Sequence, residues 1–194
     1  MKKILLLLVI ALFASNIAVS QCNGAQSFTL TPPPVNNTYQ PGQIVTMCYT
    51  MTGYPQLGAN WIEGFDLTLG AGWASVVPQT APINCQGGGG QWIWFNNTAT
   101  PAGATGPGYF FDLNGDGVTS DDFGDSGSCT WTFCVILTVA QVCTNEDLLI
   151  AVTAGPDGLW GSWNSTTCDG VVPFTVFNGT IDPALPSIGA ISHN

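Results

Sequence analysis

No lysine or arginine follows residue 3 of this sequence, and that absence limits what the chain can fold into. Its two basic side chains, Lys2 and Lys3, stand against twelve Asp and Glu residues. A carboxylate that leaves water without a partner is costly, so each one must stay hydrated, accept backbone N–H groups or bind a cation. The residues after position 3 therefore cannot form salt bridges to Lys or Arg among themselves.

The beginning of the chain has the pattern of a secretory signal peptide. The two lysines precede an apolar run over residues 4–14, and residues 18–20 (AVS) form a small-x-small cleavage site. We therefore expect residues 1–20 to be a signal peptide and residues 21–194 to be a single secreted domain. Cleavage would change the formal net charge from −10 to −12, because both lysines leave with the peptide.

The missing cations exclude several classes of function. Nucleic-acid binding requires Lys or Arg at the phosphates, and an anionic membrane surface repels an acidic chain. The single histidine, His193, is the penultimate residue, so a Ser/His/Asp or Cys/His catalytic arrangement is not expected. With 45% apolar residues, ten Phe and seven Trp, the chain also lacks the composition of a disordered acidic protein.

Seven cysteines lie in the predicted secreted domain, where disulfides are favoured, and the odd number leaves at least one free, intermolecular or modified. Cys129 and Cys134 are expected to point to opposite faces of one strand and not to pair with each other. Cys134 and Cys143 could instead face each other across a hairpin. Lipidation of Cys22 is an alternative to ordinary cleavage, although residues 19–21 lack the small residue expected immediately before a lipidated cysteine. The cysteines are residues 22, 48, 85, 129, 134, 143 and 168.

Short alternating runs of apolar and polar residues, separated by Gly, Pro and Asn, predict an all-β fold. In residues 129–139 every second side chain is apolar, as in a strand with one buried face. In residues 61–69 the same alternation places Glu63 on the apolar face beside Phe65, which is unusual. Turn residues recur at the spacing of sandwiches and barrels, so we expect one antiparallel β-sandwich, Ig-like or jelly-roll, of eight or nine strands. The predicted strands are residues 26–31, 43–50, 61–69, 72–77, 91–97, 107–113, 129–139, 147–154 and 173–178.

Residues 112–118 (DLNGDGV) match a calcium-binding loop. Asp112, Asn114 and Asp116 place side-chain oxygens at its first, third and fifth positions, and a glycine provides the tight turn at the sixth. The main-chain carbonyl of Val118 would be the seventh-position ligand. Calcium prefers such oxygen ligands, so the pattern predicts a structural Ca²⁺ site on a β scaffold.

The segment that follows departs from the EF-hand pattern, because Phe123 stands where an acidic residue is expected. Asp121, Asp122 or Asp125 would complete the ligand shell in a different geometry. An Asp/Asn/Gly-rich turn also forms without metal. We favour calcium because five Asp residues lie close together in a segment with no basic partner.

Four tryptophans are candidates for ligand binding. Trp92 and Trp94 share one face of the predicted strand 91–97, and Trp160 and Trp163 lie in a Gly/Asp/Ser-rich segment where exposure is expected. Exposed indole rings can stack on sugar rings, which makes a carbohydrate-binding module the alternative function. Packing in the core is the simpler interpretation.

A carboxylate-based extracellular hydrolase is the third possibility. Glycoside hydrolysis needs two converging carboxyl groups, and Glu63, Asp66, Glu146 and Asp147 are available. Nothing in the sequence indicates that they converge. We therefore expect solvated surface carboxylates and no enzymatic activity.

Several segments are distinctive when taken together: PGQ (41–43), VTMCYT (45–50), NWIEG (60–64), GAGW (70–73), WIWFN (92–96), GPGYFFD (106–112), FGD (123–125), WTFC (131–134) and GSW (161–163). They resemble a secreted β-rich module of Bacteroidota cell-surface proteins, of the kind described as gliding-motility-associated or exported by the type IX secretion system. The likeness covers about residues 40–170. It implies an extracellular or surface location and an adhesion-like or structural role, and it supplies no catalytic residues.

The sequence as a whole predicts a secreted or cell-surface, non-enzymatic β-sandwich for adhesion or extracellular structural interaction. Disulfides and calcium would stabilise it. Its expected partner is a surface or matrix protein, or a glycan. Nucleic acid and anionic membranes are not expected as partners.

Overall fold

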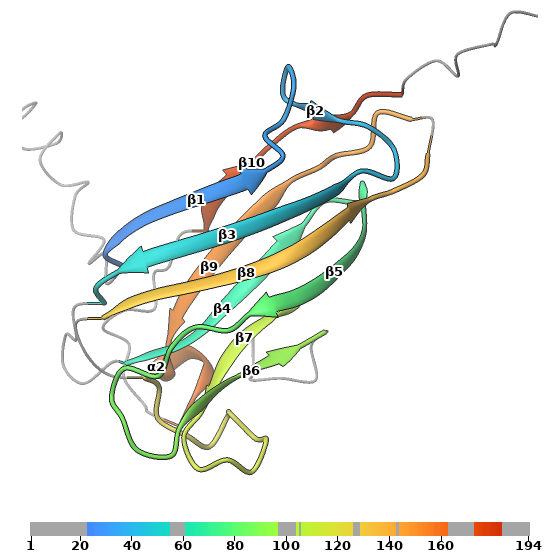
Figure 1. Cartoon of the computed structure of the whole chain (residues 1–194). Coiled ribbons are helices and arrows are strands. Elements are labelled where there is room, and N and C mark those ends of the chain that lie inside the picture. The colour runs from blue at the N-terminus through green and yellow to red at the C-terminus, as the bar shows by residue number, and fades with distance from the viewer. Residues whose placement is uncertain are drawn as a thin grey trace, which may run out of the picture.

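Two β-sheets lie face to face in the computed structural model, which describes residues 23–54, 61–96, 104, 106–125, 129–142, 144–162 and 173–183 (Figure 1). Neighbouring strands within both sheets are antiparallel. The first sheet contains, in spatial order, β1 (Ala25–Thr31), β3 (Ile44–Thr52), β8 (Thr130–Val139) and β5 (Trp73–Thr80). The second contains β10 (Phe174–Phe177), β9 (Ile150–Pro156), β4 (Ile62–Leu69), β7 (Gly108–Asp112) and β6 (Gln91–Phe95). A separate parallel pair consists of β2 (Thr38–Tyr39) and β11 (Thr180–Ile181).

Alternation within the strands builds the core between the two sheets. In β8, Trp131, Phe133 and Leu137 are fully buried, whereas most of the residues between them are half-buried. The ring of Phe133 meets Tyr49 of β3 and Phe65 of β4, with centroid distances of 5.3 and 5.4 Å. Burial of one such side chain contributes about 1.5–3 kcal/mol, so this aromatic interior strongly favours folding.

The predicted all-β antiparallel sandwich is confirmed, and each of the nine predicted strands overlaps an observed strand. The additional elements in the described residues are β2, β11 and one turn of helix, α2 (Asp157–Trp160). The two extra strands contain two residues each and the helix contains four. Elements this short carry no recognisable hydrophobic period.

The predicted face of Glu63 is wrong because β4 contains a β-bulge. The pairing of β4 with β9 shifts register: Ile62 is opposite Pro156, and the next paired residue of β4 is Gly64. Glu63 is the extra residue, which interrupts the alternation along the strand. Strict alternation would separate Ile62 from Phe65, yet both side chains belong to the main core.

Two disulfides connect segments that are distant in the sequence. Cys48–Cys134 joins directly paired residues of β3 and β8, with Cα atoms 4.1 Å apart. Cys85–Cys129 ties the segment before β6 to the residue preceding β8, with Cα atoms 5.9 Å apart. The prediction that Cys129 and Cys134 do not pair with each other is confirmed, and the hairpin pairing of Cys134 with Cys143 is wrong. The cysteines outside the described residues are Cys22, Cys143 and Cys168.

Both disulfides close long loops, with sequence separations of 86 and 44 residues. A bridge of this kind stabilises a protein by roughly 2–4 kcal/mol, and its presence is typical of an oxidising, extracellular environment. In the described part of the chain, no helix is long and apolar enough to cross a membrane.

Candidate functional site

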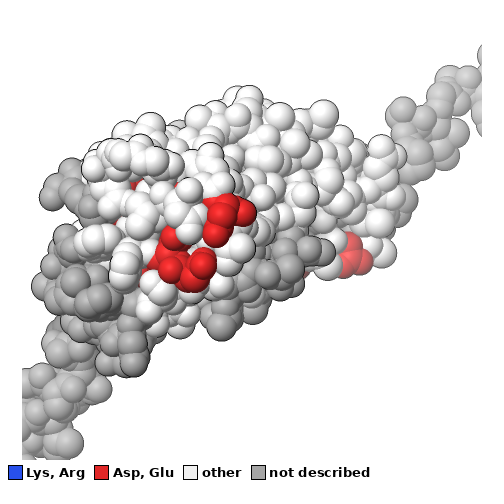
Figure 2. Space-filling model, turned by 90° about the horizontal axis from the view of Figure 1, so that it is seen from below, with Lys and Arg blue, Asp and Glu red and all other residues white. Residues whose placement is uncertain are grey.

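At one end of the sandwich, the loop between β7 and β8 and the α2 turn lie near the beginning of β4 (Figure 1). All three segments carry acidic residues. The backbones of Asp125 and Ile62 form two hydrogen bonds, of 2.8 and 3.1 Å. The Asp157 N–H donates to the carbonyl oxygen of Trp61 at 2.9 Å. Figure 2 shows Asp and Glu side chains gathered in a surface patch, and the described residues contain no Lys or Arg. Two acidic segments therefore enclose the first residues of β4.

The calcium loop predicted from the sequence folds around its own side-chain oxygens. The buried carboxylate of Asp112 accepts the N–H groups of Gly115 at 2.6 Å and Gly117 at 3.0 Å. Asn114 Oδ1 accepts the Asp116 N–H at 2.9 Å, and Asp116 Oδ1 accepts the N–H two residues further on at 2.8 Å. Gly115 and Gly117 have φ angles of 82° and 85°, a region that favours glycine. The three side chains expected to bind calcium thus also order the loop.

The remaining residues of the predicted loop site lie in different surroundings. Val118 and Asp121 are exposed, whereas Asp122 is buried. The Asp122 carboxylate accepts the Leu113 N–H at 2.9 Å, and burial raises the pKa of this carboxyl although that N–H opposes the shift. The main-chain carbonyl of Asp122 accepts the N–H and the hydroxyl of Ser162, at 2.8 and 2.9 Å. Asp122 therefore connects the loop to the residues that follow α2.

Asp125 is 1% exposed and is surrounded by N–H donors. Its carboxylate accepts the backbone N–H groups of Cys85, at 2.9 and 3.0 Å to the two oxygens, and of Gln86 at 2.9 Å. The indole N–H groups of Trp131 and Trp92 donate to it at 2.8 and 3.4 Å. Such donors stabilise the charged carboxylate without a basic partner. The role of Asp125 as a calcium ligand stays a prediction. In the structure, both of its carboxylate oxygens accept hydrogen bonds from N–H groups.

Glu63 is also buried, but unlike Asp125 it has no hydrogen-bond donors around its carboxylate among the described residues. Its side chain is 0% exposed, and neither carboxylate oxygen has a hydrogen-bond partner among the described residues. Burial, and then the negative charges of Asp157, Asp122 and Asp112, raise the pKa of Glu63 well above its usual range. The only signal for this residue in the sequence was an acidic side chain inside an apolar run.

Asp157 is a second buried carboxylate at this end of the sandwich that no sequence motif indicated. Its Oδ1 accepts the Trp61 N–H at 3.2 Å, whereas its buried Oδ2 has no hydrogen-bond partner within the described ranges. Burial raises the pKa of Asp157 to about 6, although the N–H groups of Trp61, Gly158 and Gly124 oppose the shift. No local pattern marks Asp157, because the segment it contacts is distant in the sequence.

No group of three or more His, Cys, Asp or Glu side chains in the described ranges could hold a metal ion by itself. A calcium ion at this end would therefore need other oxygens as well. Amide side chains, main-chain carbonyls and water are all common calcium ligands, and the loop offers Asn114 and its own carbonyl groups.

The tryptophans selected from the sequence do not share one exposed face. Trp92 is 7% exposed and belongs to the main core. The prediction that Trp160 is exposed is wrong, since it is 3% exposed and packs against Phe110. Trp94 is half-buried, and its indole N–H donates to Asn96. Trp163 lies outside the described residues.

The carboxylates considered for hydrolysis are divided along the sandwich. Glu63 and Asp66 belong to β4. Glu146 and Asp147 precede β9, and the Asp147 carbonyl accepts the N–H of Gly72, just after the far end of β4. The second pair therefore lies at the opposite end of β4 from Glu63.

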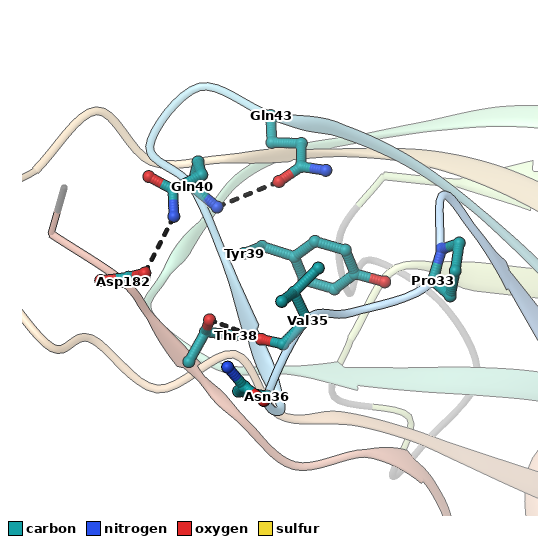
Figure 3. A pocket seen from close by; sticks show the side chains of 8 residues that line it. All are labelled: Pro33, Val35, Asn36, Thr38, Tyr39, Gln40, Gln43 and Asp182. Atoms are coloured by element: carbon teal, nitrogen blue, oxygen red, sulfur yellow. Dashed lines mark hydrogen bonds between the residues drawn. The ribbon is translucent and has the colours of Figure 1, made fainter.

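A cavity of about 410 Å³ lies beside the β2–β11 pair, and no motif in the sequence pointed to it (Figure 3). Several of its polar groups bond to one another. The Gln40 amide donates to Asp182 at 3.0 Å, and the Gln40 N–H donates to the side chain of Gln43 at 3.0 Å. The lining residues are Pro33, Val35, Asn36, Thr38, Tyr39, Gln40, Gln43 and Asp182.

Comparison of the chain with protein-family models, with curated proteins and with solved structures found no match. Function must therefore be argued from the site, because a fold alone does not specify it. The distinctive features of this site are an ordered acidic loop and buried carboxylates in surroundings without Lys or Arg.

Proposed function

We propose that this protein is a secreted or cell-surface, non-enzymatic β-sandwich module that acts in adhesion or extracellular structural interaction. A calcium ion bound by the loop between β7 and β8 stabilises the module. The proposed ligands are Asp112, Asn114, Asp116 and the main-chain carbonyl of Val118, with Asp121 or Asp122 completing the shell.

The observation that carries this proposal is a loop folded around the oxygens of Asp112, Asn114 and Asp116 in surroundings without Lys or Arg. These side chains hold backbone N–H groups at 2.6–3.0 Å, so their oxygens are already directed into the loop. Calcium offsets the repulsion between clustered carboxylates that lack basic partners. The closed aromatic core and the two disulfides support a structural role. The resemblance to secreted Bacteroidota surface modules points in the same direction.

The calcium part of the proposal is tested by thermal unfolding. We expect millimolar calcium to raise the melting temperature of the chelator-treated protein by about 5–10 °C, as a ligand at about 100 times its dissociation constant would. Asp116→Asn should lose most of this shift because it removes a loop charge. Glu146→Gln removes a carboxylate at the far end and should keep it. A melting temperature that does not respond to calcium would contradict the proposal.

The adhesion part is tested by a binding screen against matrix proteins and glycans, run with and without calcium. We expect binding to a surface or matrix protein that weakens in chelator. Binding to a glycan in preference to any protein would favour the carbohydrate-binding alternative, for which half-buried Trp94 is the remaining described candidate among the four tryptophans. If the protein binds no matrix protein and no glycan, with or without calcium, adhesion is rejected and a purely structural role is left.

A further inference from the structure

A second group of oxygens lies inside the molecule, next to the calcium loop but formed largely by other elements. Glu63, at the β-bulge of β4, approaches the residue that follows α2: a Cβ placed on Gly161 would lie 3.1 Å from Glu63 Oε2 and 3.1 Å from Asp157 Cβ. The same position is 2.8 Å from the carbonyl oxygen of Asp122. Acidic residues from three segments therefore surround one glycine.

Three carboxylate oxygens of this group are shielded from water and lack donors among the described residues. Glu63 and Asp157 are both 0% exposed. Glu63 Oε1, Glu63 Oε2 and Asp157 Oδ2 have no hydrogen-bond partner in the described part of the chain. The described residues also contain no Lys, Arg or His. A buried carboxylate in such surroundings needs a positive charge or a donor from outside the protein.

A calcium ion meets this need better than a proton does. A proton on Glu63 would remove one charge and serve at most two of the three unpartnered oxygens. One calcium ion binds carboxylates through one or both oxygens and also accepts main-chain carbonyls and water.

We propose that Glu63 and Asp157 hold a second, interior calcium ion, with Glu63 contributing both carboxylate oxygens and Asp157 contributing Oδ2. Gly161 lies close beside Glu63, where a Cβ would crowd the Asp122 carbonyl, and the hydrogen bonds from Ser162 fix this carbonyl at the edge of the site. The ion would connect β4, the α2 turn and the acidic loop. This site does not require the loop site to be occupied, so either one can exist without the other.

The test counts calcium ions bound to the chelator-treated, disulfide-bonded protein by equilibrium dialysis with Ca²⁺ as the only probe. We expect two ions in the wild-type protein. Glu63→Gln and Asp157→Asn, which keep the side-chain shape, should each leave one ion. Asp116→Asn should also leave one ion, because it weakens the loop site alone. Glu146→Gln is the matched control and should keep both.

Other patterns of binding have distinct meanings. A single wild-type ion that is lost in Asp116→Asn and retained in Glu63→Gln and Asp157→Asn overturns the interior site and leaves the loop proposal standing. A single wild-type ion that is retained in Asp116→Asn and lost in Glu63→Gln and Asp157→Asn supports the interior site and rejects the loop site. A single ion lost in all three variants means that Glu63 and Asp157 serve the loop, which overturns a separate site. No bound calcium overturns both.

A measurement on the wild-type protein covers the case in which a variant fails to fold. Terbium replaces calcium at oxygen sites, and its luminescence lifetimes in H₂O and D₂O count the coordinated waters. We expect two classes of bound terbium, with fewer coordinated waters at the shielded interior site than at the loop on the surface. A single hydrated class would overturn the interior site.

Discussion

Asp125 and Glu63 are buried carboxylates at the same end of the sandwich, yet their surroundings are opposite. Asp125 accepts N–H groups from Cys85, Gln86 and two tryptophans. Glu63 follows Ile62, whose backbone pairs with that of Asp125, and its oxygens have no partner among the described residues. A sandwich whose described residues contain no Lys, Arg or His can therefore stabilise a buried anion with its own N–H groups or, as we propose, with an added cation.

Stabilisation by N–H groups and stabilisation by a cation depend on different conditions. The donors around Asp125 are held by the fold itself, because Cys85 is tied to Cys129 by a disulfide and Trp131 lies in the central strand β8. This stabilisation is present whenever the protein is folded and oxidised. Under the proposal of an interior calcium ion, the environment of Glu63 becomes favourable only when calcium is available, and stability at this end would depend on calcium.

Loss of the Asp125 carboxylate should lower the stability of the protein most. Asp125→Ala leaves the N–H groups of Cys85, Gln86 and the Trp131 indole without their acceptor in the interior. We expect the free energy of unfolding to fall by about 3–5 kcal/mol, measured by urea denaturation in calcium. Half-buried Glu146 lies at the far end of the sandwich, and Glu146→Gln should change stability by less than about 0.5 kcal/mol. A similar small change for both variants would contradict the role given to Asp125.

Glu63→Gln should change the free energy of unfolding less than Asp125→Ala does, and in opposite directions with and without calcium. In calcium the variant should be less stable than the wild-type protein, because it loses the interior ion. In chelator it should be more stable by about 1–2 kcal/mol, because it removes a buried charge that nothing compensates. Urea denaturation under both conditions measures the two differences. The same sign in both conditions would show that calcium does not act through Glu63.

The smallest effect is a pH dependence that appears when calcium is removed. Burial raises the pKa of Asp157 from 3.8 to about 6, so between these values the folded state binds more protons than the unfolded state. The free energy of unfolding therefore falls as pH rises through this range. Moving the chelated protein from pH 7 to pH 5 should stabilise it by about 1 kcal/mol, and the raised pKa of Glu63 acts in the same direction. Loss of stability at pH 5 in chelator would contradict this view of the buried carboxylates.

The strands could be predicted because their information is local. In β8 every second residue enters the core, and the same period is readable along residues 129–139 without knowledge of a partner. The calcium loop is equally local, since Asp112, Asn114 and Asp116 lie within five residues of each other. These features therefore need no information about tertiary structure.

The pair of buried carboxylates, Glu63 and Asp157, could not be predicted because it is created by contacts between distant segments. The β-bulge that reorients Glu63 is defined by the register of β4 on β9, and register is not visible in either strand alone. Asp157 accepts a hydrogen bond from the N–H of Trp61, far away in the sequence. The role of Asp125 likewise depends on Cys85, which the disulfide to Cys129 brings close.

Long-wavelength X-ray diffraction can locate calcium in the interior of this sandwich. Crystals grown in calcium should give an anomalous difference map with one peak in the loop formed by residues 112–118 and a second between the carboxylates of Glu63 and Asp157. A map with the loop peak present and no peak beside Glu63 would contradict the claim that calcium neutralises this buried carboxylate.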